Sequence, residues 1–144
     1  ETLPLPMIPA EIETSPLSAV RYHSLRRRFY SGTGLVEWPE ETCGYILSYI
    51  GYCRGHAVEI NGGESYLLSY PSPENNGVII CEEAGLDIEM TSLPVILSAL
   101  RILYPDSVSV LLSTPAQDCG EKYLLCKPFP LLPDSSAVFS FAME

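Results

Sequence analysis

Two apolar runs that flank an amphipathic segment constrain the fold more than any other feature of the chain. Residues 78–84 (VIICEEA) and 107–113 (SVSVLLS) have the pattern of strands, and residues 92–104 place apolar side chains on one face of a helix. A strand, a helix and a second strand of the same sheet form a crossover, which pairs the two strands in parallel. The sequence therefore predicts a sheet that contains a parallel pair.

The residues before this unit predict an antiparallel meander. HAVEI (56–60) and SYLLSY (65–70) are separated by NGGE, and Asn-Gly tolerates the positive φ of a tight hairpin turn. The stretch PSPENNG then turns the chain into the strand at 78–84. We expect these three strands to pair in an antiparallel manner, and two later strands to form in KYLLCKPF and AVFSFAM.

Two helices are expected before the meander. The first spans residues 16–30, with Ser15 as its N-cap and Pro16 in its first turn, and the second spans 39–53. The proline-rich residues 1–14 form an extended linker or edge segment, and residues 15–144 form a single domain. The predicted fold class is α/β (α+β), with a mixed, mostly antiparallel sheet flanked by helices.

Charge and cysteine content exclude several classes of protein. A formal charge of −10 argues against binding to nucleic acid, and no apolar run is long enough to span a bilayer. The chain starts with Glu1 rather than methionine, which is compatible with a fragment of a longer protein. The five cysteines form no CxxC pair, so we expect reduced thiols in a cytoplasmic protein. They are Cys43, Cys53, Cys81, Cys119 and Cys126.

The junction between the strand at 78–84 and the next helix is rich in acidic residues. The stretch EEAGLDIEMTSLP (82–94) holds four carboxylates and one glycine, Gly85, with no Lys or Arg nearby in the sequence. Carboxylates repel a polyanion, so we expect no phosphate to bind at this junction. Alternatively, Asp87 and Glu89 only stabilise the first turn of the helix through its dipole. Both interpretations exclude a phosphate site here.

The order of these segments resembles the GNAT superfamily of N-acetyltransferases, and in particular the C-terminal half of bacterial tandem-GNAT proteins. The similarity rests on YHSLRRRFY, VEW, YILSYIGYCRGHAVEI, SYLLSY, VIICEEA, VLLSTP, KPF and FAM, and it covers about residues 16–143. In that family a loop of the form Arg/Gln-x-x-Gly-x-Gly/Ala holds the pyrophosphate of acetyl-CoA. Residues 82–94 occupy the corresponding place and lack this pattern.

The resemblance implies a degenerate GNAT-like domain that packs on an N-terminal catalytic GNAT domain and shapes the groove for an acceptor amine. This chain would bind no cofactor itself, and acetyl-CoA would bind elsewhere in the full-length protein. One alternative is an active acetyl-CoA-dependent N-acetyltransferase whose atypical cofactor site uses the arginines of residues 21–28. Another is a non-enzymatic module that forms a homodimer through a sheet edge and exposed tyrosines.

The resemblance also implies three candidates for catalysis. Glu82 or Glu83 would act as a general base on an amine, and Tyr123 would act as a general acid. For Tyr123, a role in the core or in the wall of a groove is the competing interpretation. For Glu82 and Glu83, the argument against catalysis is that a base has nothing to act on without the cofactor loop. Cys53 and His56 have the spacing of a thiol–imidazole pair, against which a buried thiol is the simpler interpretation. No pattern of metal ligands is present in the sequence.

Overall fold

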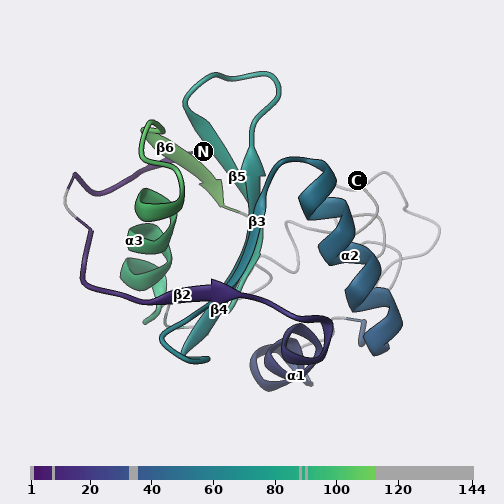
Figure 1. Ribbon diagram of the computed structural model, residues 1–144. Helices are drawn as coiled ribbons and strands as arrows, with labels where there is room; N and C mark the ends of the chain where they lie inside the picture. The colour runs from purple at the N-terminus through teal and green to yellow at the C-terminus, as the bar shows by residue number, and fades with distance from the viewer. Residues whose placement is uncertain (1, 8, 33–35, 88, 90, 113–144) are drawn as a thin grey trace.

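The computed structural model of the protein describes residues 2–7, 9–32, 36–87, 89 and 91–112 (Figure 1). From α1 to β6, the helices and strands of this part of the chain follow the predicted order, and two short strands precede them. They are β1 (Thr2–Pro4), β2 (Thr14–Pro16), α1 (Ala19–Tyr30), α2 (Glu40–Tyr52), β3 (His56–Ile60), β4 (Ser65–Pro71), β5 (Val78–Ala84), α3 (Leu93–Leu103) and β6 (Ser109–Leu112).

The described strands form one mixed sheet with the order β1-β6-β5-β4-β3-β2. Strands β5 and β6 pair in parallel across the α3 crossover, and the other neighbouring strands pair in an antiparallel manner. Figure 1 shows α3 on one side of the sheet and both α1 and α2 on the other. The predicted fold class, a mixed and mostly antiparallel sheet flanked by helices, is confirmed.

The hairpin between β3 and β4 forms where the Asn-Gly sequence predicts it. Asn61, Gly62 and Gly63 have φ angles of 51°, 71° and 109°, in the left-handed region that side chains other than Asn and Gly rarely adopt. These three residues reverse the chain, so that Ile60 lies opposite Ser65 at the end of the hairpin. The observed bounds of β3 and β5 are the predicted ones.

The start of the first helix differs from the prediction. Residues Thr14–Pro16 pair with β3 as the edge strand β2, so Ser15 is opposite Glu59 in the sheet and does not cap a helix. Ser18 is the N-cap instead, and its hydroxyl accepts a hydrogen bond from the backbone N–H of Arg21 at 3.2 Å. Because residues 14–16 pair with β3, α1 begins three residues after the predicted start at residue 16.

The proline-rich N-terminal segment supplies both edges of the sheet. Strand β1 pairs with β6 at one edge, and the segment then runs to β2 at the opposite edge. The two later strands predicted in KYLLCKPF and AVFSFAM lie outside the described residues, as does Tyr123.

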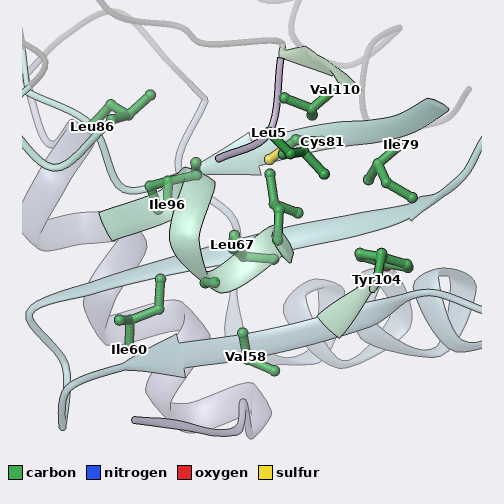
Figure 2. Packing of buried hydrophobic residues seen from close by; sticks show 13 residues of the cluster. Leu5, Val58, Ile60, Leu67, Ile79, Cys81, Leu86, Ile96, Tyr104 and Val110 are labelled. Atoms are coloured by element: carbon green, nitrogen blue, oxygen red, sulfur yellow. The ribbon is translucent and has the colours of Figure 1, made fainter. Parts of the chain in front are cut away.

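Buried side chains form one cluster on each face of the sheet. On the α3 side, shown in Figure 2, Leu67, Ile79 and Val110 of the strands pack against Ile96 and its neighbours on the helix. On the other side, Tyr22 and Leu25 of α1 and Ile50 of α2 pack against Leu68 of β4. Burying each such side chain stabilises the fold by about 1.5–3 kcal/mol, and the two clusters together hold both helical layers on the sheet.

Candidate functional site

A β-bulge places Glu82 and Glu83 on the same side of the sheet. Leu68 lies opposite Glu83 and Ser69 lies opposite Cys81, so Glu82 is an extra residue in β5. In a regular strand, consecutive side chains point to opposite faces. Here both carboxylates line one small pocket of about 20 Å³ beneath α1 and α2. The other lining residues are Tyr22, Trp38, Ile46, Tyr49, Ile50 and Leu68.

The Glu83 carboxylate is the centre of a buried polar network, and its side chain is only 3% exposed. Arg26 of α1 approaches Oε2 of Glu83 through its Nε at 3.3 Å, and the Tyr66 hydroxyl donates to Oε1 at 2.6 Å. The Arg26 guanidinium also donates to the Val36 carbonyl at 2.6 Å and lies 3.7 Å from the centre of the Trp38 ring. A substrate amine would have to displace Arg26 or Tyr66 to reach this carboxylate.

The sequence prediction that no cation lies near these acidic residues is wrong for Glu83. The prediction followed from the absence of Lys and Arg between Arg54 and Arg101 in the sequence. Helix α1 nevertheless brings Arg26 to Glu83 across 57 positions of sequence. Burial has the largest single effect on the pKa of Arg26 and lowers it, but the charge of Glu83, the neighbouring Tyr22 and Tyr66, and the hydrogen bond to Glu83 together more than offset burial, so the pKa is raised.

Three tyrosines surround the two carboxylates: Tyr22 and Tyr66 are fully buried, and Tyr70 is half-buried. Burial, and secondarily the charge of Glu83, raise the pKa of both Tyr22 and Tyr66 well above the usual value. Tyr70 donates a hydrogen bond to Glu82, and burial followed by this bond raises the pKa of Tyr70. The Tyr22 hydroxyl makes no hydrogen bond of ordinary geometry within the described residues. We name Glu82, Glu83 and these three tyrosines, with Arg26, the carboxylate–tyrosine cluster.

The backbone after β5 donates its hydrogen bonds into the protein. The N–H of Gly85 donates to the Tyr66 carbonyl at 2.8 Å, and the N–H of Leu86 donates to the Tyr30 hydroxyl at 3.1 Å. The Tyr30 hydroxyl in turn donates to the Ala84 carbonyl. A phosphate site at a strand–helix junction needs such N–H groups to face the ligand. At this junction both groups are already committed to internal partners.

Close packing explains why the junction contains a glycine. A Cβ atom at Gly85 would lie 2.8 Å from Cε2 of Phe29 and 2.9 Å from Oγ of Ser65. The Ser65 hydroxyl also donates to the Gly85 carbonyl at 2.7 Å. Gly85 therefore allows α1 and β4 to approach the junction, which is a structural use of glycine.

The alternative role of Asp87 and Glu89 in the first turn of the helix is also wrong. Helix α3 begins at Leu93 and has no acidic residue in its first turn. Asp87 instead accepts hydrogen bonds from the Thr91 backbone N–H at 2.9 Å and the Thr91 hydroxyl at 2.6 Å. These two bonds close the loop that precedes α3.

The arginines of residues 21–28 have internal partners as well. Arg21 forms two hydrogen bonds with Glu59, at 3.1 and 2.9 Å, and Arg27 forms an exposed ion pair with Glu37 at 3.3 Å. Arg28 donates to backbone carbonyls of the turn between β3 and β4. Together with the Arg26–Glu83 pair, these contacts leave the arginines of residues 21–28 poorly suited to hold a polyanion.

Two further candidate residues, Cys53 and His56, lie where α2 ends and β3 begins. His56 packs edge-on against Tyr104, with 5.1 Å between ring centroids, and Cys53 is half-buried at the end of α2. Cys43, Cys53 and Cys81 are free thiols, and Cys119 and Cys126 lie outside the described residues. Burial raises the pKa of Cys43 to about 11 and that of Cys81 further. Neither buried thiol is therefore suited to nucleophilic chemistry.

No family model, curated protein or solved structure matches this chain. In the part of the chain that the structure describes, no helix has the length and apolar character needed to cross a membrane. The same residues contain no group of three or more His, Cys, Asp or Glu side chains that is suited to hold a metal ion.

Proposed function

We propose that this chain is a degenerate GNAT-like domain, which packs on a catalytic GNAT domain and shapes the acceptor groove without binding acetyl-CoA itself. The order of helices and strands and the parallel β5–β6 pair support the resemblance on which the proposal rests. A formal charge of −10 favours an acceptor that carries a positively charged amine, because long-range attraction raises its local concentration.

One observation carries the proposal: the N–H groups of Gly85 and Leu86 donate to Tyr66 and Tyr30 rather than outward. Turning them toward a pyrophosphate would break two hydrogen bonds, each of which contributes about 0.5–1.5 kcal/mol. It would also leave the buried carbonyl of Tyr66 without this donor. The main argument against a cofactor site here is therefore that these backbone N–H groups already have internal partners. Repulsion between the four carboxylates and a pyrophosphate is a secondary argument.

An active acetyltransferase with an atypical cofactor site is less well supported. Such a site would use the arginine cluster of α1, and Arg21, Arg26 and Arg27 are each paired with a carboxylate. A cofactor phosphate would have to replace these partners. At Arg26 this replacement would leave Glu83 buried without its counter-ion, which is strongly unfavourable.

The acetyl-CoA test uses calorimetry on the whole chain at low ionic strength, where electrostatic effects are largest. We expect no measurable binding by the wild type, and none by the variant Asp87→Asn/Glu89→Gln, which removes two exposed carboxylates without changing the core. Binding that appears only in this variant would show that carboxylate charge, rather than the internal hydrogen bonds of Gly85 and Leu86, prevents cofactor binding. A wild-type dissociation constant in the low micromolar range would overturn the proposal.

A second candidate function, a homodimerising module, is favoured by two tyrosines on α2. Tyr45 and Tyr52 are 63% and 88% exposed, and tyrosine is enriched at protein interfaces. The sheet edges suit dimerisation less well, since β1 and β2 are three residues long and end in Pro4 and Pro16, which lack an N–H group. Sedimentation equilibrium distinguishes the functions: a wild-type dimer that Tyr45→Ser/Tyr52→Ser abolishes would favour the module, and a monomer would exclude it.

A further inference from the structure

Part of the sheet face on the α1–α2 side is open and carries three aliphatic side chains. The contacts of α1 and α2 concentrate on β3 and β4, and they leave a groove of about 680 Å³ over β5 and β6. Val78, Ile80 and Leu111 line this groove, and the loop of residues 72–76 forms a wall of it. We call it the β5–β6 groove.

The two faces of the same strands differ sharply in burial. On the α3 side, Ile79 is 1% exposed and Val110 is fully buried. On the groove side, their neighbours Val78 and Ile80 are half-buried and Leu111 is 40% exposed. Aliphatic side chains grouped on one face of a sheet are typical of a surface that another segment covers.

We propose that the β5–β6 groove is covered by the C-terminal part of the same chain, and specifically by residues 122–133 (KYLLCKPFPLLP). Strand β6 ends at Leu112, directly after the groove residue Leu111, so the chain leaves from the rim of the groove. Ten extended residues reach about 33 Å, which is more than the roughly 15 Å across four adjacent strands. The segment therefore reaches every part of the groove without strain.

The composition of this segment matches the groove. Residues 122–133 are mainly apolar and contain Lys122 and Lys127, the two lysines of the whole sequence, with no acidic residue. The chain as a whole carries a formal charge of −10, and Glu74 lies on the groove wall. A segment with two positive charges on an acidic surface gains favourable electrostatic energy in addition to apolar burial.

The segment is expected to lie on the face of the sheet rather than beside β6. The outer edge of β6 already pairs with β1, with Thr2 opposite Leu111 and Pro4 opposite Ser109. Residues 122–133 also contain three prolines, which cannot donate to a strand ladder, so the proposal replaces the strand predicted in KYLLCKPF with packing on the sheet face. Side-chain packing on the open face is the arrangement that needs no displacement of β1.

Cys126 lies within the proposed segment and reports on its burial. In the variant Cys53→Ser/Cys119→Ser, the only other thiols are Cys43 and Cys81, which are both buried. The rate of alkylation of Cys126 by N-ethylmaleimide is measured by peptide mass spectrometry, in buffer and in urea. We expect native alkylation to be at least about tenfold slower than in urea, as for other groups protected by packing. Equal rates would overturn the proposal.

Two matched substitutions locate the protecting surface. Leu111→Lys in the groove should raise the native rate of Cys126 alkylation toward its rate in urea, because a lysine there repels Lys122 and Lys127. Ile102→Lys on α3 is the control, since Ile102 is 44% exposed and Leu111 is 40% exposed. Circular dichroism verifies folding, and Leu111→Thr repeats the test if the lysine variant fails to fold. The proposal would be overturned if the Leu111 and Ile102 substitutions changed the rate of Cys126 alkylation equally. It would also be overturned if protection of Cys126 increased with protein concentration, because a second copy would then be the cover.

Discussion

Arg26 and Glu83 form a buried ion pair that joins α1 to β5, with 3.3 Å between Nε and Oε2 and side chains that are 6% and 3% exposed. Each partner has further contacts: Tyr66 donates to Glu83, and Arg26 lies over the Trp38 ring. A buried charge that loses its partner is costly, so this pair constrains how the first helix sits on the sheet.

The effects of removing the two members of this pair on stability should be coupled. We expect Arg26→Met and Glu83→Gln each to lower the free energy of unfolding by about 3–5 kcal/mol, because each variant leaves a polar or charged group buried without its partner. The double variant should lose less than the sum of the single losses. Urea unfolding measures all three, and strictly additive losses would contradict the pairing.

The buried tyrosines predict a loss of stability at high pH. The pKa values of Tyr22, Tyr30, Tyr66, Tyr70 and Tyr104 are raised, with burial as the largest cause in each. In the unfolded chain these groups ionise near pH 10, whereas in the folded chain they stay protonated to higher pH. Their contribution to stability is therefore complete below about pH 10 and is lost as the pH rises through the folded pKa values.

Absorbance at 295 nm tests this directly, since it reports tyrosinate. We expect these five tyrosines to ionise at higher pH in the folded protein than in urea. Tyr66→Phe should remove one late group without adding an early one. Ionisation of all nine tyrosines near pH 10 in the folded protein would contradict the described burial.

Two glycine substitutions should have opposite effects on stability. Gly85→Ala forces a Cβ atom to within 2.8 Å of Phe29 and should cost about 1–3 kcal/mol through overpacking. Gly51→Ala in α2 meets no atom within 4 Å and should stabilise the helix by about 0.5–1 kcal/mol. Thermal unfolding of both variants provides the measurement, and a neutral effect at Gly85 would be inconsistent with the tight junction.

The cysteines should all be titratable as free thiols in the denatured protein. Cys43, Cys53 and Cys81 are free in the structure, and the spacing of Cys119 and Cys126 predicts no disulfide. A denaturing thiol titration should therefore find five groups. In the native protein near pH 8, Cys53 should react faster than Cys43, whose pKa is raised to about 11 by burial. Three or one titratable thiols would reveal a disulfide.

Local sequence patterns predicted most of the described fold. The hairpin at β3–β4 follows from Asn61 and Gly62, and α3 follows from a regular apolar face. The start of α1 could not be predicted in the same way, because Ser15 and Ser18 are both good N-caps. The choice between them depends on the pairing of β2 with β3, which is a long-range interaction.

The candidate site was predicted only in part for a related reason. Glu82 and Glu83 were identified from the sequence, but strand alternation places consecutive residues on opposite faces, and only the bulge in β5 brings them together. The partner of Glu83, Arg26, lies 57 positions away and belongs to a cluster that resembles a solvated helix face. A buried ion pair between distant elements has no local signature in a single sequence.

The inward N–H groups of Gly85 and Leu86 are the strongest evidence against a cofactor site after β5. The most direct test is a ¹H–¹⁵N NMR titration of the whole chain with acetyl-CoA at low ionic strength. We predict that the amide signals of these two residues do not shift, and that their hydrogen exchange stays slow at every cofactor concentration. A saturable shift centred on Gly85 and Leu86, with a dissociation constant in the low micromolar range, would contradict the account.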